Sequence, residues 1–505
     1  MSWDAIVIGA GHNGLTAAAR LGQAGRKVLV LEALDRPGGL LGDAGGMRMA
    51  MMPAGISAEI ARALALHRHG LKYAGPMPTI ALGGAEPVRI DGAKVSGTDA
   101  AMAEAYGELH QRLTRQAGAL RSMLLKTPPR FRDGGLGDLA KLGRMGLSIR
   151  KLGKTDMRDL LRIILSNAWD LLNDEIGDGP LAGALAMDAT LGGAMGPRSP
   201  GTVLSLLYRM AGQGAGAAGQ RAMPVGGPDA LIKALVGAIE SVGGEIRTDA
   251  PVERILVGAG DSVTGIRLTS GEEILAPLVL SNLAPRRTLL DLLGAAHLDG
   301  EDVRRTRHIA SNGMVARLDF ALLGLPDVDG LQGADLSHRL IVAPKMQALE
   351  TAFNAAKYGE LPERPVLECS FATDGAPRLS VSAQFVPYAL KGGWSAAQRA
   401  KLSSSVVSVL ETAMPGITKL IAGTTIATPA DIETRFGLPG GHWHHGELRV
   451  DQLLMLRPFG GAAQYRMPVG GLYLCGAGAH PGGDISGAPG WNAAGQAMKD
   501  RGAAT

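Results

Sequence analysis

The chain begins with an apolar run that leads directly into a glycine-rich turn and an alanine-rich segment. After the run at 5–8, glycines stand at Gly9, Gly11 and Gly14. In this Gly-x-Gly-x-x-Gly spacing Gly9 permits a tight turn, Gly11 lets backbone approach phosphates, and Gly14 lets a helix pack closely on the strand. The helix predicted over 15–25 would direct its first N–H groups at an anion. The turn therefore predicts a dinucleotide pyrophosphate site, the alternative being a strand-to-helix turn that binds nothing.

A second predicted strand, 27–31, ends in an acidic residue. Glu32 follows Gly14 at close to the offset of about 20 residues at which an acid accepts hydrogen bonds from ribose hydroxyls. Arg36 then precedes Pro37 and the glycine pair that begins at Gly38, a combination that flavin oxidoreductases typically carry after this strand. These residues favour FAD over NAD.

Length and composition limit the remaining classes of protein. A chain of 505 residues with 46% hydrophobic content has room for two or three domains and is not disordered. The formal charge of +4 is small and the basic residues are spread out, so nucleic-acid binding is not expected. No stretch approaches the roughly 18 consecutive apolar residues of a membrane-spanning helix. No secretory signal is recognisable before the glycine turn, and we expect a cytoplasmic protein.

The two cysteines, Cys369 and Cys475, lie far apart in the sequence. They form no Cys-x-x-Cys pair and cannot supply a zinc set, so we expect neither a metal site nor disulfide redox chemistry. Electron transfer would then require a bound cofactor.

The chain leaves the pattern of a nucleotide domain and later returns to it. Residues 98–172 read as successive helices rich in Leu and Met, which suggests a separate helical substrate region. The segment 223–227, Met-Pro-Val-Gly-Gly, then precedes a predicted helix whose apolar positions recur over 231–239. A hairpin over 252–268 and a strand over 275–280 are expected to follow.

The second half of the chain has a mixed pattern. Strand-like runs at 314–320, 366–371 and 379–385 precede a predicted helix over 402–410, which suggests a sheet backed by helices. The segment 471–494 reads as a short strand, a glycine-rich turn and a helix of small residues. Such a turn can lie against a flat ring system, and the helix start can stabilise negative charge on it. The alternative is a glycine-rich loop without a ligand.

Together these segments resemble the phytoene-desaturase-like FAD oxidoreductases, and most closely the branch named for pyridine nucleotide-disulfide oxidoreductase domain-containing protein 2. The resemblance covers nearly the whole chain. Besides the N-terminal turn it rests on the motifs at 223–227, on Phe-Gly-Leu-Pro-Gly-Gly-His-Trp-His-His-Gly-Glu-Leu at 436–448, on Arg457-Pro with Tyr465-Arg466, and on 471–494. It implies an isoalloxazine ring between two domains, over an apolar cavity.

The fold class that follows is α/β. A Rossmann-like, glutathione-reductase-like FAD-binding domain is expected to be interleaved with a mixed α+β substrate domain. The FAD-binding domain would comprise residues 1–75, 222–295 and 455–505. The substrate domain would comprise 76–221 and 296–454, as a helical insert plus a mixed sheet.

The residues expected to bind FAD come from four parts of the chain. They are Gly9, Gly11, Asn13 and Gly14; Glu32, Ala33, Arg36, Gly38 and Gly39; Val252, whose backbone would meet the adenine; and Gly476, Gly478, Gly483, Asp484, Trp491 and Asn492. Three places depart from the family pattern. Asp484 stands where a glycine is usual, and Trp491 stands where a basic residue is common. The segment 40–52 replaces a Thr-containing segment.

For the chemistry, the resemblance implies that N5 of oxidised FAD accepts a hydride from a substrate carbon while the protein manages a proton. The acid–base candidates are His445, Glu447 and His480, because His titrates near neutrality and burial can raise the pKa of a carboxylate. Each has an alternative interpretation. His445 would otherwise hold a turn, together with His444, and Glu447 would pair with a base such as Arg449 or Arg457.

Substrate character follows only indirectly from composition. With 20 Met and 4% aromatic residues, the cavity is expected to be aliphatic and adaptable, which suits a hydrophobic substrate such as an isoprenoid or a carotenoid. Three alternatives stay open. They are an amine oxidase, whose aromatic cage could use Phe459, Tyr465, Trp443 and Trp491; a redox-neutral isomerase; and an FAD-stabilised binding or scaffold protein.

The segment 121–162 holds 11 Lys or Arg against 4 Asp or Glu, interleaved with apolar residues. Basic amphipathic segments of this kind can lie on an anionic membrane surface. The alternative is a solvated helix face that packs on the FAD domain. The sequence leaves the oligomeric state open.

Overall fold

The computed structural model describes most of the chain. The described residues are 2–42, 49, 55–130, 134–214, 217–218, 221–372 and 375–502. Of the segment 40–52, which departs from the family pattern, residues 43–48 and 50–52 lie outside the described residues.

A five-stranded parallel sheet carries the N-terminal turn. Its strand order is β18 (Leu472–Leu474), β12 (Val279–Ser281), β1 (Ala5–Ile8), β2 (Val28–Leu31) and β8 (Glu245–Arg247). Each neighbouring pair is parallel. The residues of β1 and β2 are all buried, as expected for strands covered on both faces, which read as continuous apolar runs. Three distant parts of the chain thus meet in one sheet.

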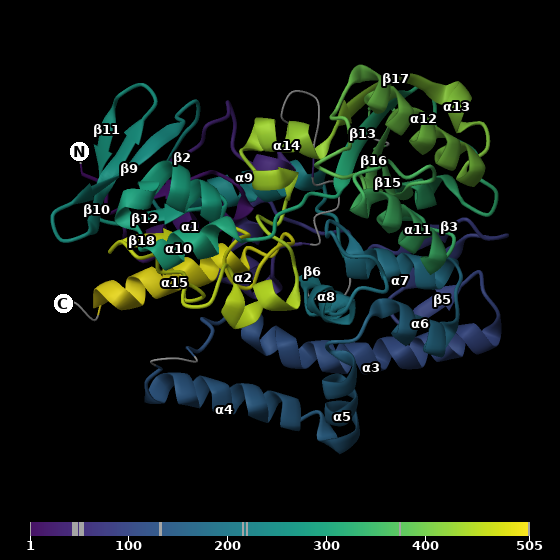
Figure 1. The fold of residues 1–505 in the computed structure, drawn as a ribbon, viewed down its shortest axis with the longest axis horizontal. Helices are drawn as coiled ribbons and strands as arrows, with labels where there is room; N and C mark the ends of the chain where they lie inside the picture. The colour runs from purple at the N-terminus through teal and green to yellow at the C-terminus, as the bar shows by residue number, and fades with distance from the viewer. Residues whose placement is uncertain are drawn as a thin grey trace.

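The helices that cover this sheet pack closely because glycines stand at their contacts. The helix α1 (His12–Gln23) packs against α9 (Gly227–Glu240) and α15 (Ala488–Gly502), as Figure 1 shows on the left of the molecule. A Cβ added at Gly14 would lie 2.1 Å from the Gly9 carbonyl oxygen, and one at Gly490 would lie 1.9 Å from that of Asn13. A larger residue at position 14 would push α1 away from the end of β1, and one at position 490 would push α15 away from α1.

The strand predicted over 275–280 is two strands in two sheets. β11 (Glu273–Leu275) pairs antiparallel with β10 (Ser262–Leu268), which pairs with β9 (Val252–Gly258) in a three-stranded sheet. The chain then crosses to β12 in the parallel sheet. Pro277 lies at this crossing, and because proline has no N–H to donate, a continuous strand is interrupted there.

A mixed sheet of eight strands forms the other half of the molecule. Its order is β17 (Ile421–Ala427), β13 (Val315–Leu322), β16 (Arg378–Gln384), β15 (Val366–Ala372), β14 (Arg339–Val342), β3 (Thr79–Leu82), β4 (Val88–Asp91) and β5 (Lys94–Ser96). Of these pairings, β14 with β3 is parallel. The predicted runs at 314–320, 366–371 and 379–385 correspond to β13, β15 and β16. One face of the sheet packs on α12 (Ala396–Ala413) through a shared apolar core.

A group of helices lies beside and below the eight-stranded sheet in Figure 1. They are α3 (Ala100–Leu124), α4 (Leu136–Arg150), α5 (Gly153–Ile163), α6 (Ala168–Ile176), α7 (Pro180–Thr190) and α8 (Thr202–Met210). Except for α4, which has no buried residue, they contribute to one apolar core with β14 and α11 (Met346–Lys357). Within the described residues, no helix is long and apolar enough to cross a membrane.

The remaining elements are short. They are α2 (Ala58–Ala63), the π-helix Arg287–Gly294, α10 (Gly300–Arg307), α13 (Ile417–Leu420), α14 (Pro429–Phe436), the strand pair β6 (Gln213–Gly214) and β7 (Ala217–Ala218), and 3₁₀ turns at Gly39–Leu41, Leu66–His69, Ala295–His297, Gly333–Ser337, Pro439–Gly441, Val450–Gln452 and Leu454–Leu456.

The predicted fold class is confirmed. A Rossmann-like parallel sheet and a mixed sheet stand side by side, each with its own apolar core. The core under the parallel sheet draws its residues from between Trp3 and Leu71, between Leu231 and Leu293, and between Phe459 and Ala497. The chain therefore passes back and forth between the two halves.

Candidate active site

A cavity of about 360 Å³ extends from the glycine turn to the eight-stranded sheet. Residues at the carboxyl ends of β1 and β2, Gly9 and Glu32, line it. Arg317 on β13 and Ser380 on β16 line it as well. Ligands of open parallel sheets bind at the carboxyl ends of the strands, so the position of this cavity fits a dinucleotide site.

The start of α1 is open toward the cavity. Gly11 stands at the N-cap, and no side chain caps the first N–H groups of the helix. A Cβ on Gly11 would lie 2.7 Å from Asn282 Nδ2, so only glycine leaves this approach free. The buried atoms Asn13 Oδ1 and His12 Nε2 have no hydrogen-bond partner, and both side chains line the cavity. The uncapped backbone N–H groups at the start of α1 are free donors, and they suit an anionic ligand.

Glu32 is held rigidly beside this turn. Its Oε2 accepts a hydrogen bond from the Ala10 N–H at 2.7 Å, and its Oε1 accepts one from the Leu34 N–H at 3.0 Å. Burial raises the pKa of Glu32, and these backbone bonds partly offset the rise. Ala33 and Val252 line the same cavity.

The glycine pair after β2 also lies at the cavity, whereas the basic residue before it does not. Gly38 and Gly39 line the cavity at φ +131° and +54°. The Gly38 N–H donates to the Ala10 carbonyl at 2.9 Å, which ties this turn to the end of β1. Arg36 is exposed, pairs with Asp35 at 3.3 Å and is not among the lining residues.

In the C-terminal glycine-rich turn, Asp484 lines the cavity, while the predicted glycines act in packing. A Cβ at Gly476 would lie 2.4 Å from the Asn282 carbonyl oxygen, one at Gly478 would lie 2.4 Å from Pro285 Cδ, and one at Gly483 would lie 2.1 Å from His444 Cδ2. These glycines let the turn approach its neighbours. They do not themselves line the cavity.

The last two predicted contacts lie away from the cavity wall. The Arg20 guanidinium lies over the Trp491 ring, 3.9 Å from its centroid. Asn492 Nδ2 donates to the Leu124 carbonyl at 2.8 Å. Both residues therefore join α15 to neighbouring helices, and neither lines the cavity.

The three acid–base candidates lie in different surroundings. His445 lines the cavity, its Nδ1 has no hydrogen-bond partner, and burial lowers its pKa to about 3. Glu447 does not line it, because its Oε2 accepts a hydrogen bond from the Ala194 N–H at 3.1 Å and lies 3.4 Å from His442 Nε2. His480 faces a separate cavity of about 60 Å³, where its Nε2 lies 3.2 Å from the Met123 carbonyl oxygen.

The structure pairs a histidine with a carboxylate that the sequence did not link, since His444 was expected only to hold a turn and Asp484 to contact FAD. His444 Nε2 lies 3.5 Å from Asp484 Oδ1, and both side chains line the cavity. Burial lowers the pKa of His444 to about 4. Burial alone would raise the pKa of Asp484, but Arg209 and His444 hold that pKa well below its ordinary value. Three of the 11 histidines fall within 442–445, a density that could have indicated this site.

One buried arginine holds the histidine loop, 442–447, against the C-terminal turn. The three guanidinium nitrogens of Arg457 lie 2.6–3.2 Å from the carbonyl oxygens of His444, Gly446, Glu447, Gln452 and Ala477. Arg457 is 1% exposed. Burial lowers its pKa to about 10, so the side chain stays charged at neutral pH. A single guanidinium thus donates hydrogen bonds to five backbone carbonyls from three separate segments of the chain.

The far wall of the cavity is polar, which the sequence analysis missed. We call its five residues the polar wall: Arg317, Glu368, Ser370, Ser380 and Ser382. Arg209 and Arg221 line the cavity nearby. The signal was present in the predicted strands, where polar and apolar residues alternate, but it was interpreted only as evidence for a sheet.

The helical segment 98–172, expected to be a substrate region, contributes none of the described residues that line this cavity. Met49 is the one methionine among the described lining residues. The apolar faces of α3, α5 and α6 pack on one another and on α7 and α8 instead. Their Leu and Met residues therefore build a core.

Comparisons with known proteins identify the family. The NAD(P)-binding Rossmann-like domain family matches residues 7–44. Pyridine nucleotide-disulfide oxidoreductase domain-containing protein 2 of Rattus norvegicus is 30% identical, and the alignment covers 99% of this chain and 94% of the rat protein. The chain belongs to the phytoene-desaturase-like family of FAD oxidoreductases. The phytoene desaturase (neurosporene-forming) of Rhodobacter capsulatus is 27% identical, over 95% of this chain and 91% of that protein.

Solved structures share the fold of this family member. Cyclohexylamine oxidase from Brevibacterium oxydans has a TM-score of 0.58 at 16% identity, covering 99% of this chain and 100% of that one. An oxidoreductase from Methanosarcina mazei has the same TM-score at 17% identity, covering 98% and 99%. Identities this low show a common fold alone.

FAD is the cofactor of this family member, and the residues present fit it. The uncapped N–H groups at the start of α1 suit the pyrophosphate. Glu32, Ala33 and Val252 would hold the adenosine end, and Ala477 and Asp484 line the same cavity.

The name of the branch mentions disulfide chemistry, but the two cysteines of this chain do not form a redox pair. Cys369 and Cys475 are buried and unpaired, and burial raises the pKa of both thiols. No group of His, Cys, Asp and Glu among the described residues could hold a metal ion.

The Arg457 contacts generate a first prediction. We expect Arg457→Met to lower the free energy of unfolding by about 3 kcal/mol or more, because several buried carbonyls lose a charged donor. It should also reduce the FAD content of the purified protein, measured from flavin absorbance. Arg449→Met is the control, since Arg449 is exposed and pairs with Asp451 at 3.1 Å. Equal stability of the two variants would contradict the role assigned to Arg457.

The histidines generate a second prediction. Burial lowers the pKa of His12, His444 and His480 to about 4, and that of His445 to about 3. The unfolded chain protonates them near 6.5, so stability is fully present above that pH and is lost as pH falls toward about 4. Each histidine contributes about 1.4 kcal/mol per pH unit in this window, which Glu32 partly offsets because its raised pKa acts in the opposite direction.

Urea unfolding of the FAD-loaded protein at a series of pH values measures this dependence. His445→Gln should remove about one proton from the slope. The same substitution at the exposed His67 should leave the slope unchanged. An unchanged slope in His445→Gln would show that this imidazole is not buried in its neutral form.

Proposed function

We propose that this protein is a dehydrogenase of the desaturase type, acting on a CH–CH unit of a substrate with an apolar, isoprenoid or carotenoid-like body. One observation carries the proposal: the cavity that contains the FAD cradle extends into the substrate domain without an aromatic cage. The Phe, Tyr and Trp side chains among its described lining residues are Phe436 and Trp443. Phytoene desaturases among the relatives at 27–30% identity support the same reaction class.

Aliphatic side chains give an apolar substrate body a place to bind. Those that line the cavity include Leu40, Leu41, Met49, Leu191, Leu438 and Ile485. They come from both halves of the molecule, so a chain that contacts them would lie across the junction between the two sheets. Burial of such a chain is favoured by the hydrophobic effect.

Amine oxidation is less well supported by the cavity. Of the four aromatic residues that could form a cage, Trp443 lines the cavity, whereas Phe459 and Tyr465 belong to the core under the parallel sheet and Trp491 packs on Arg20. Lining arginines would also repel a cationic amine. The fold shared with amine oxidases carries no chemistry by itself.

FAD, when bound, supplies the acceptor for a hydride equivalent from carbon. The protein must then take the proton that leaves the neighbouring carbon. Among the described residues that line the cavity, His12 Nε2 and His445 Nδ1 are imidazole nitrogens without a hydrogen-bond partner, and burial lowers the pKa of both side chains, so both are free of a proton at neutral pH. We assign the proton to His445, because it adjoins the His444–Asp484 pair. Asp484 orients the adjacent imidazole of His444 through their contact at 3.5 Å.

Anaerobic bleaching of the flavin absorbance tests this proposal. With a panel of isoprenoid polyenes, saturated isoprenoids and amines, we expect isoprenoids to bleach the flavin and amines to leave it oxidised. His445→Gln should retain FAD and slow the bleaching by about a hundredfold or more, the usual contribution of a positioned proton acceptor. His308→Gln, at an exposed histidine on the surface, should bleach at the normal rate.

Two results would contradict the desaturase reaction. Bleaching by amines alone would indicate an amine oxidase. No bleaching by any compound would favour a redox-neutral isomerase, detected as a changed product with reduced flavin, or a binding protein in which FAD stabilises the fold.

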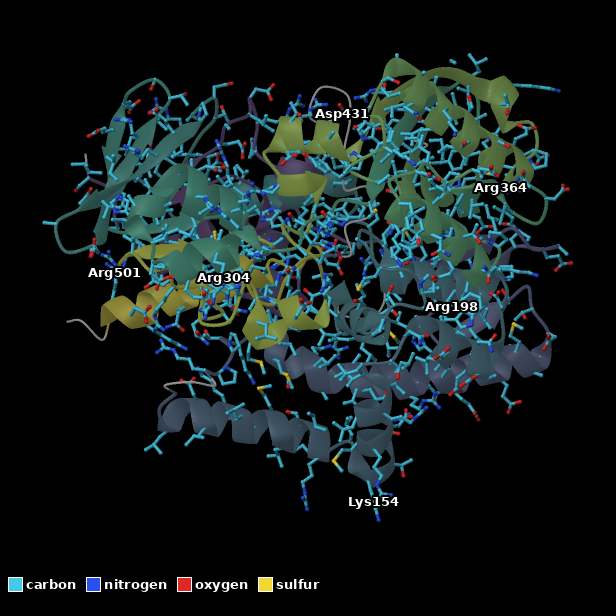
Figure 2. All side chains as sticks on the ribbon, in the orientation of Figure 1. Lys154, Arg198, Arg304, Arg364, Asp431 and Arg501 are labelled. Carbon is cyan, nitrogen blue, oxygen red and sulfur yellow. The ribbon has the colours of Figure 1, made fainter. Side chains whose placement is uncertain are left out.

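We further propose that α4 rests on an anionic membrane surface. Three of its leucines are exposed, with Leu136, Leu139 and Leu147 being 86%, 62% and 51% exposed. Beside it lies a cavity of about 510 Å³ whose charged lining residues are Lys126, Arg130, Asp138, Lys141, Arg144, Arg466 and Lys499. Figure 2 shows Lys154 at the outer end of the following helix, directed away from the molecule. Exposed leucines beside a basic cavity match an anionic lipid surface.

Cosedimentation with vesicles tests this contact. The protein should bind vesicles that contain phosphatidylserine more strongly than neutral vesicles, and added salt should weaken the binding. Neutralising Arg144, Arg150, Lys151 and Lys154 should abolish the preference. Neutralising Arg304, Arg305 and Arg307 on α10 is the control for loss of charge elsewhere. Unchanged binding after the first set of substitutions would overturn the proposal.

A further inference from the structure

The inner face of the eight-stranded sheet is polar where three central strands pair. Arg317 of β13 stands opposite Ser382 of β16, which stands opposite Glu368 of β15. One step along, Asp319 stands opposite Ser380, which stands opposite Ser370. The six side chains form two adjacent rows on one face, because side chains alternate along a strand. Their alternates, among them Leu318, Cys369 and Val381, belong to the apolar core of the opposite face.

This polar face is buried, although it does not serve as a core. Its residues are between 2% and 9% exposed, and five of them, the polar wall, line the cavity that extends from the glycine turn. A site built for a pure hydrocarbon would gain from apolar residues at these positions, since burying polar groups is costly unless they are hydrogen-bonded. The polar wall therefore indicates a polar ligand group.

Arg317 has donors that the protein leaves unpaired. Its Nη1 donates to Ser382 Oγ at 2.8 Å. Its Nη2 lies 3.7 Å from Asp319 Oδ1, which is too long for a hydrogen bond, and that oxygen accepts a hydrogen bond from Ser380 Oγ. Nε and Nη2 of Arg317 thus have no hydrogen-bond partner. An arginine buried to 2% exposure with free donors is suited to a ligand acceptor.

The other charges around the polar wall are already compensated. Glu368 accepts a hydrogen bond from Arg339 Nε, and Arg339 Nη2 lies 2.8 Å from Asp188 Oδ1. Asp188 also accepts a hydrogen bond from Arg221 Nη2 at 2.7 Å. These acids and bases pair among themselves, so neither Glu368 nor Asp188 accepts a hydrogen bond from the free donors of Arg317.

Two further unpaired donors line the same cavity. They are Arg209 Nε and Trp443 Nε1. Asp319 Oδ2 is an unpaired acceptor, but Asp319 is not a lining residue. The unpaired atoms of Arg317, Arg209 and Trp443 are therefore all donors, whereas unpaired acceptors at the cavity, such as Asn13 Oδ1 and His445 Nδ1, belong to the start of α1 and to the histidine loop.

We propose that the substrate of this protein carries a carboxylate at one end of its apolar body, and that Arg317 binds this carboxylate at the polar wall. The planar guanidinium fork matches a carboxylate with two parallel hydrogen bonds. Ser370 and Ser380, the hydroxyls on neighbouring strands, line the same wall. The assignment rests on the proposed function for the apolar body, and it deepens that function by naming the head group.

Binding measurements that do not depend on turnover test the head group. Isothermal titration calorimetry on the oxidised, FAD-loaded protein, kept anaerobic, compares retinoic acid, retinol and retinylamine, which share one isoprenoid chain. We expect retinoic acid to bind at least about tenfold more tightly than retinol, the value of a hydrogen bond to a charged group, and retinylamine to bind most weakly.

Substitutions then assign the preference to Arg317. Arg317→Met should weaken retinoic acid binding by about tenfold to a hundredfold and retinol binding by less than about threefold. Arg317→Lys, which keeps the charge but not the fork, should fall between the two. Arg364→Met is the control, since Arg364 is exposed on the outer side of the same half of the molecule, as Figure 2 shows.

If Arg317→Met does not retain FAD, the wild-type series and Trp443→Phe decide the question. Trp443→Phe keeps an aromatic ring and removes one unpaired donor, so it should reduce the preference for retinoic acid over retinol. Equal binding of acid and alcohol by the wild type, or strongest binding of the amine, would overturn the inference. So would an unchanged acid affinity in a folded Arg317→Met variant.

Failure of this inference differs from failure of the proposed function. A preference for the acid without bleaching of the flavin by any isoprenoid would keep the head-group assignment and contradict the desaturase reaction. Bleaching by isoprenoids without a head-group preference would support the desaturase reaction and contradict the head-group assignment.

Discussion

The buried guanidinium of Arg457 is the interaction on which the active site depends. It collects backbone carbonyls from the histidine loop, from Gln452 and from Ala477, segments that share no regular secondary structure with one another. Loops cannot satisfy their polar groups by a ladder of hydrogen bonds, so a central donor replaces the ladder. Because Arg457 fixes both loops, His444, His445 and Asp484 reach the same cavity wall.

The cavity lies between two surfaces with different binding roles. On one side, the uncapped start of α1 and the rigid carboxylate of Glu32 form a site for a dinucleotide. On the other side, the polar wall presents a buried cation and hydroxyls from three paired strands. A reaction at the flavin would therefore be coupled to recognition of a distant group on the substrate. Binding energy from a remote group can position the reacting carbon.

Local patterns predicted the fold well and the side-chain positions less well. The turn at Gly9, the strands of the parallel sheet and the three central strands of the mixed sheet were recognisable because burial on two faces or alternation leaves a short-range signal. Within the motif at 436–448, however, His445 lines the cavity and Glu447 turns away to the Ala194 N–H. Side-chain direction there follows from loop conformation, including the positive φ of His445, and no periodicity encodes it.

The sequence by itself determined the α/β class, the family and the FAD cradle, because each depends on residues close together along the chain and on backbone rules that hold everywhere. Only the tertiary structure decided which polar residues meet. Arg317, Ser382 and Glu368 are spread over three strands and become neighbours through strand register. His444 meets Asp484 through loop packing around Arg457. Contacts between distant segments depend on how the cores assemble, and a local pattern carries no record of that assembly.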